Sequence, residues 1–281
     1  MAGPIQQIQQ DLTALESALA NLAQGFEIAY QDYLTALGEA VRKQLILACY
    51  HLCTQGYPEA FLKLSFSQRQ KFQQDLQYLA QGAQTRLNHL IHLKSEPVDS
   101  ALSDDQTSFD EEQLPETDPS LSQPSQGVSS FTRPEQLAQW QEQIESGVGQ
   151  CLSQLSKDTN FLVQEFNIFT PKLPEAILEV ASQAETNTET VAGSPNLLTM
   201  MIETEDHEKP QTTAIARLMA IHLRLSEIEF ADATVMTGRH QVRHLSGQLN
   251  QLQHDFNKKL QEKAVLEAES AWRSSWFEIQ S

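Results

Sequence analysis

The sequence contains no apolar run long enough to cross a membrane. Its longest uninterrupted run, Leu45 to Tyr50, is far shorter than the ~20 residues that a spanning helix needs. No basic and then apolar leader precedes Ile5, so we expect neither a secreted nor an integral membrane protein. Only three cysteines occur, an odd number that is typical of free thiols in a reducing compartment. These absences favour a cytoplasmic location and no disulfide.

Glycine and aromatic residues are also scarce. Eleven of the 281 residues are glycine and 7% are aromatic, whereas Leu, Ala, Gln and Glu, which favour helices over strands, are abundant. A hydrophobic content of 40% is enough for a real core. Most of the formal charge of −18 comes from residues 95–132 and 182–212, and therefore from linkers rather than from a folded acidic face. The composition predicts an all-α fold.

Motifs for catalysis or cofactor binding are missing too. No Gly-Lys pair exists, which excludes a Walker-type phosphate-binding loop. Gly147 and Gly149 begin a dinucleotide-binding pattern, but Leu152 stands where its third glycine is needed. Neither the Gly-x-Ser-x-Gly nor the His-Glu-x-x-His motif occurs. We therefore predict no catalytic residue and no cofactor.

The first part of the chain carries a helical apolar seam. Spacings that alternate between three and four place a set of apolar residues on one face, at the period of a coiled coil or a helical bundle. This set consists of Ile5, Ile8, Leu12, Leu15, Leu19, Leu22 and Phe26. The pattern continues to about Thr54, and Gly56 and Pro58 then supply the signals that usually end a helix.

A second helix is predicted after a short connection. Ser67 and Gln70 have the spacing of a capping box, and an apolar face continues from there to about Leu93. Two long helices with a short connection bury their seams by packing antiparallel. Residues 1–94 are therefore expected to form a helical hairpin.

The remaining chain alternates between acidic and helical segments. We divide it into a disordered acidic linker (95–132), a helical segment (133–184), a flexible acidic linker (185–212) and a C-terminal part (213–281). A short amphipathic helix is expected over Pro174–Ala184, and the second linker contains an apolar island at Leu197–Ile202. In the last part, a helix over Thr213–Phe230 precedes a long helix with Asp232 as its N-cap. These helices either complete the hairpin's bundle or form a second one.

Two residue pairs have the spacing of metal ligands. Cys49 and Cys53 share a helical face, but buried small hydrophobic residues have the same pattern. His240 and His244 are also one turn apart, and the arginines beside them disfavour a cation. We predict that the protein holds no metal.

The last helix reverses the charge of the chain, with a net charge of +3 over residues 233–264. Its basic residues are Arg239, Arg243, Lys258, Lys259 and Lys263. One interpretation is a solvated face that pairs with the acidic linkers. The other is a surface for an anionic partner, which would be a nucleic acid, a lipid surface or an acidic protein.

Large aromatic residues gather close to the end of the sequence. They are accompanied by an arginine, in the set Trp272, Arg273, Trp276 and Phe277. Such residues are typical anchors of protein interfaces, although they could equally cap the protein's own bundle.

Two blocks resemble uncharacterised cyanobacterial proteins. They are Cys53-Thr-Gln-Gly-Tyr-Pro-Glu-Ala-Phe-Leu62 and Ala271-Trp-Arg-Ser-Ser-Trp-Phe277. The resemblance implies a cytoplasmic bacterial context and brings no activity, cofactor or functional residue.

Heptad seams, acidic linkers and terminal aromatic anchors together favour a non-catalytic adaptor or scaffold that binds protein partners, with self-association as one form of binding. The alternative is nucleic-acid binding through the basic last helix. An enzyme of unrecognised type is the third hypothesis.

Overall fold

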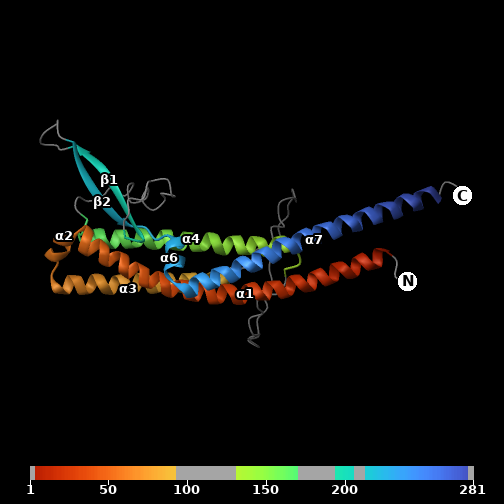
Figure 1. Ribbon diagram of the computed structural model, residues 1–281, viewed down its shortest axis with the longest axis horizontal. Coiled ribbons are helices and arrows are strands. Elements are labelled where there is room, and N and C mark those ends of the chain that lie inside the picture. The colour runs from red at the N-terminus through yellow and green to blue at the C-terminus, as the bar shows by residue number, and fades with distance from the viewer. Residues whose placement is uncertain (1–3, 93–130, 170–193, 206–212, 278–281) are drawn as a thin grey trace, which may run out of the picture.

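The computed structural model describes residues 4–92, 131–169, 194–205 and 213–277, except for the side chains of residues 4, 5, 200–217, 276 and 277 (Figure 1). In chain order the elements are α1 (Pro4–His51), a π-helical turn (Leu52–Gly56), α2 (Pro58–Lys63), α3 (Phe66–His89), a 3₁₀ turn (Leu90–His92), α4 (Pro134–Glu165), β1 (Leu197–Glu205), β2 (Thr213–Ile221), α6 (Leu225–Ala231) and α7 (Ala233–Phe277). The predicted all-α fold is confirmed, with one two-stranded sheet in the part of the chain that the structure describes.

The longest helices, α1 and α7, lie antiparallel from the middle of the molecule to the end where both termini lie (Figure 1). Lys43 near the end of α1 pairs with Asp232 just before α7, and Lys259 of α7 pairs with Asp11 near the start of α1. The apolar seams of both helices are buried between them. The C-terminal helix therefore packs on the N-terminal hairpin.

Two further helices complete a four-helix body. α3 packs on α1 as the predicted hairpin, and α4 packs on α3 and α7, so that each of the four helices has two neighbours. A continuous core fills the body. Its largest fully buried side chains are Trp140, Tyr30, Tyr33, Phe26, Phe169, Leu19, Leu34, Leu37, Leu45, Leu52, Leu87 and Leu137. Among the described residues, no helix is both long and apolar enough to span a membrane.

The helix boundaries differ in detail from the prediction. α1 ends near the expected position, but its last turn widens into the π-helical turn before Pro58 starts α2. The capping box that opens α3 is formed by Ser65 and Gln68 rather than by Ser67 and Gln70. Because the backbone is extended at Ser65, the Ser65 hydroxyl can accept from the backbone N–H of Gln68 at 3.3 Å. The side-chain oxygen of Gln68 in turn accepts from the backbone N–H of Ser65 at 2.8 Å.

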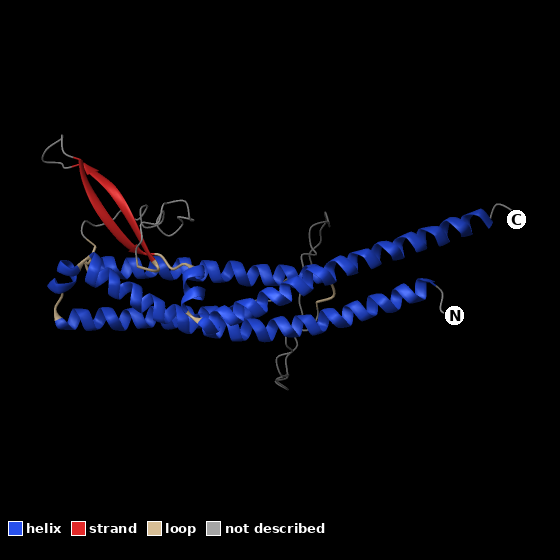
Figure 2. Cartoon of the chain, in the orientation of Figure 1, coloured by secondary structure: helices blue, strands red, loops and turns tan. Residues whose placement is uncertain are grey.

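The segment before α7 is where the prediction was wrong. The expected helix over Thr213–Phe230 is the strand β2 followed by the short helix α6, and the apolar island in the expected linker 185–212 lies in β1. The two strands pair antiparallel in the register Leu197↔Ile221 to Glu205↔Thr213 and project from the body (Figure 2). The prediction that Asp232 caps the last helix is confirmed, because its carboxylate accepts from the Thr234 amide at 3.0 Å. Residues 95–130 of the predicted linker and the predicted helix Pro174–Ala184 lie outside the described residues.

Side chains of the four-helix body form hydrogen bonds with the base of the hairpin of β1 and β2. The Asn160 amide of α4 donates to the Ile221 carbonyl at 2.9 Å and accepts from the Ile221 N–H at 2.8 Å, as a neighbouring strand would. The Tyr57 hydroxyl forms the same pair of bonds with the backbone of Met219, and the Ser156 hydroxyl accepts from the Leu223 N–H. These three side chains bind the outward-facing backbone groups at the base of β2, at residues 219 and 221, and those of Leu223 just after it.

Asn160 is therefore expected to be more important for stability than its size suggests. Asn160→Ala leaves a buried N–H and a buried carbonyl of Ile221 without partners, and we expect a loss of about 2 to 4 kcal/mol in unfolding free energy. Urea denaturation measures the loss, with Gln150→Ala on the exposed face of α4 as the control. Equal stabilities of the two variants would contradict the assigned role.

Candidate functional site

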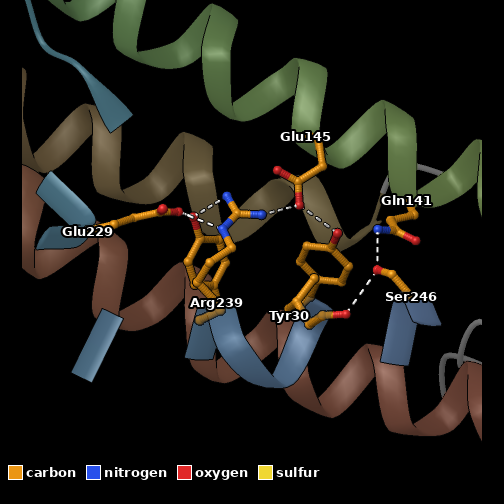
Figure 3. A network of polar contacts seen from close by, with 8 residues as sticks. Tyr30, Gln141, Glu145, Glu229, Arg239 and Ser246 are labelled. Atoms are coloured by element: carbon orange, nitrogen blue, oxygen red, sulfur yellow. Dashed lines mark hydrogen bonds and ion pairs between the residues drawn. The ribbon is translucent and has the colours of Figure 1, made fainter. Parts of the chain in front are cut away.

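A cluster of charged and polar side chains lies where four helices meet. α1 supplies Tyr30 and Tyr33, α4 supplies Glu145, α6 supplies Glu229 and α7 supplies Arg239. We call these five residues the polar junction (Figure 3). It forms because α7 approaches α1 closely at Gly238, where an added Cβ would lie 3.2 Å from the Cα of Tyr33. The neighbouring Arg239 is thereby placed inside the body.

The guanidinium of Arg239 uses all three of its nitrogens in the polar junction. Its Nη1 lies 2.6 Å from Glu145 Oε1, its Nε lies 2.5 Å from Glu229 Oε1, and its Nη2 donates to the Tyr33 hydroxyl at 2.6 Å. The Tyr30 hydroxyl donates to Glu145 and the Tyr33 hydroxyl donates to Glu229, each at 2.7 Å. Arg239 also lies over the Tyr33 ring, with its Cζ 4.6 Å from the centroid.

These contacts fix the protonation states. Burial, and then the charge and hydrogen bond of Glu145, raise the pKa of Tyr30 well above its ordinary value. Burial raises the pKa of Tyr33 as well, against the opposing charge of Arg239. Burial alone would lower the pKa of Arg239, but the bonds and charges of its carboxylate partners outweigh burial and raise it. Both phenols therefore stay neutral and the guanidinium stays charged.

The polar junction is suited to holding helices in register. A buried ion pair with complete hydrogen bonds tolerates one arrangement of its partners, whereas an apolar seam tolerates sliding. Arg239 was predicted from sequence as part of a surface for partners. The structure places it 9% exposed, between two carboxylates that lie 94 residues before it and 10 residues before it in the chain. Only the fold brings Glu145 to this position.

Beyond the body, α1 and α7 are the two described elements that continue. We call residues 4–18 of α1 and 256–277 of α7 the stalk (Figure 2). Ile8, Leu12 and Phe256 form its small core, and Leu15 and Leu266 pack against them. The stalk carries most of the residues that the sequence marked as candidate partner contacts.

The structure places these candidates differently from one another. Lys259 pairs with Asp11 at 3.1 Å and with Glu262 at 2.9 Å, and Lys263 lies 3.8 Å from Glu267. Arg243 and Lys258 are exposed and form no ion pair among the described residues. Trp272 is 67% exposed, and Arg273 is exposed and lies 3.4 Å from Glu269. Trp276 and Phe277 are in the last turn of α7, where side chains are not described. Lys259 and Lys263 thus have carboxylate partners within α1 and α7, and the predicted pairing with the acidic linkers falls largely outside the described residues.

The candidate metal ligands are not brought together. Cys49 and Cys53 are buried, which confirms their interpretation as small hydrophobic core residues, and His240 and His244 are exposed. Within the described ranges, no group of three or more His, Cys, Asp or Glu side chains is placed to hold a metal ion.

Sequence reasoning missed an open groove between α3 and α4. Its volume is about 1300 Å³. Most of its lining residues are of polar types, with Arg86, Glu142, Gln143 and Lys157 among them, but they line it mainly with apolar atoms. No motif marks it, because its members come from two helices that a long segment of the sequence separates.

Comparison of the whole chain with protein-family models, with curated proteins and with solved structures finds no match.

The polar junction yields a test of stability. Arg239→Met leaves Glu145 and Glu229 facing each other without a cation, and removal of one partner of a buried pair typically costs about 3 kcal/mol or more. Arg243→Met, one turn later on the exposed face, should change stability by less than about 0.5 kcal/mol. Thermal and urea unfolding compare the two variants. If Arg239→Met is as stable as the control, the polar junction does not hold the helices.

The thiols yield a second test. Burial raises the pKa of all three cysteines, that of Cys53 to about 12, so that the reactive thiolate is scarce at pH 8. We expect a thiol-specific disulfide reagent to label none of them within minutes in the folded protein and all three after denaturation. Rapid labelling of the native chain would contradict the burial of these side chains.

Proposed function

We propose that the protein is a non-catalytic helical adaptor or scaffold that binds protein partners through the stalk. The observation that carries this proposal is a group of exposed apolar side chains on α7 beyond the body. Leu260 is 41% exposed, Val265 is 51% exposed and Trp272 is 67% exposed, and Arg273 follows directly. Single exposed apolar residues are ordinary, but Val265 and Trp272 lie two turns apart on the same face of α7, where one partner can cover both. Leu260 lies about 140° around the helix from Val265 and extends the exposed apolar surface to a second face.

The chemistry of the patch supports a protein as the partner. Tryptophan and arginine are the residues most enriched among the contacts that dominate binding energy at protein interfaces. The four-helix body and the polar junction support the same proposal, because they give α7 a rigid base from which its last turns extend. A partner that binds such a preorganised surface loses little energy to ordering the protein.

Nucleic-acid binding is the weaker candidate. Arg243 and Lys258 are the exposed members of the basic set that form no ion pair in the described residues. Arg239, Lys259 and Lys263 have carboxylate neighbours from the same chain, which compete with phosphate groups.

Substitution separates these functions. We expect Trp272→Ala to reduce capture of partner proteins from a native lysate by the immobilised full-length chain about 30-fold or more, because truncation of a central aromatic anchor costs roughly 2 kcal/mol or more. Phe66→Ala is the matched control, since Phe66 is an aromatic side chain of 80% exposure on α3. Quantitative mass spectrometry of the captured proteins gives the comparison.

Two outcomes would count against the adaptor. Equal capture by Trp272→Ala and Phe66→Ala would remove the stalk as the binding surface. Recovery of nucleic acid that falls steeply with salt and is lost in Arg243→Ala and Lys258→Ala would favour the alternative.

A further inference from the structure

The outer face of α7 carries a continuous exposed stripe. Its members follow each other at spacings of three and four residues, and all of them are exposed: His254, Lys258, Gln261, Val265, Glu269 and Trp272. The stripe does not face α1. Val265 lies about 100° around the helix from its neighbour Leu266, which packs against the small core of the stalk.

The members of this stripe are placed nearly symmetrically about Val265. The half before Val265 and the half after it have complementary chemistry. Lys258 lies seven residues before Val265 and Trp272 lies seven residues after it, which is two helical turns in each direction. Gln261 and Glu269 lie four residues before and after it. A cation and a hydrogen-bond donor thus occupy one half, and an aromatic ring and a carboxylate occupy the other.

We propose that a second copy of this chain docks on the stripe, antiparallel, with the two-fold axis at Val265. This inference rests on the stalk being the binding surface that the proposed function assigns, and it names the partner. In this pairing Val265 meets Val265 of the second copy, and Lys258 of each copy lies against Trp272 of the other. The interface is isologous, as in most homodimers.

The contacts of this pairing are favourable at each level of the stripe. An ammonium group over an indole face is attracted by the ring quadrupole, and the pairing forms this contact twice. The Gln261 amide of one copy is at the level of the Glu269 carboxylate of the other and can donate to it. A parallel arrangement would instead place Lys258 opposite Lys258, where like charges repel. The charge pattern therefore selects the antiparallel orientation.

The mass of the full-length chain in solution tests the association. Sedimentation equilibrium should give a concentration-dependent dimer, with a dissociation constant that rises tenfold or more in Trp272→Ala and in Lys258→Ala. The double variant should be little weaker than either single variant, because each substitution removes the same contact. Both side chains are exposed, so the variants keep the fold, which circular dichroism checks. A monomer at all concentrations overturns the proposal, as do fully additive effects of the two substitutions.

Disulfide trapping tests the position of the axis. Val265→Cys should form a disulfide-linked dimer under mild oxidation, since the two introduced thiols meet at the axis and the native cysteines are buried. Gln251 is exposed on the same side of α7, three residues before His254, but in the proposed dimer its two copies would be about 40 Å apart. Gln251→Cys should therefore stay monomeric under denaturing electrophoresis. Equal cross-linking of both variants, or of neither, contradicts an axis at Val265.

The two proposals fail separately. A monomeric chain whose capture of other proteins still depends on Trp272 overturns the dimer and leaves the adaptor. A dimer that links through Val265→Cys but captures nothing in a manner dependent on Trp272 overturns the adaptor and leaves the dimer.

Discussion

The structure depends on how one buried cation is neutralised. Arg239 has been removed from water, and its desolvation is offset only when Glu145, Glu229 and Tyr33 surround it together. These groups come from α1, α4, α6 and α7, so no subset of the helices satisfies the requirement. Hydrophobic burial supplies most of the driving force for folding, but it is not directional. The polar junction selects one arrangement among those that bury a similar area.

This selection determines what α7 presents to solvent. With Arg239 held inside, Val242, Leu249 and Phe256 follow on the inner face, and the opposite face is left to polar residues and then to Val265 and Trp272. A slip of α7 by one residue would rotate every side chain by about 100° and expose part of the seam. The exposed stripe of the stalk and the buried network of the body are thus two consequences of the same helix rotation.

Much of the fold could be predicted from the sequence, because the helical seams are local periodic signals and the Asp232 cap is a local interaction. The hairpin of β1 and β2 was not predictable in this way. Its strands contain Leu, Met and Ala, which also suit helices, and β2 is stabilised by Asn160, which lies far from it in sequence. Arg239 was assigned to the surface for the same reason, since its carboxylate partners are brought to it only by the fold. For Trp272 the sequence left an interface anchor and a cap on the protein's own bundle equally open, and in the structure its side chain is 67% exposed.

The hairpin of β1 and β2 is attached to the body at its base, so its base and its far end differ in how much change of sequence and length they tolerate. Among the described residues, Tyr57, Asn160 and Ser156 bind the backbone at positions 219, 221 and 223 and no backbone of residues 213–218. Because a strand repeats every two residues, the hairpin can gain or lose residues in pairs at its far end without changing which backbone groups meet the body. The base is therefore constrained in sequence and length, whereas β1 and β2 can change length at their far ends while the four-helix body keeps its packing.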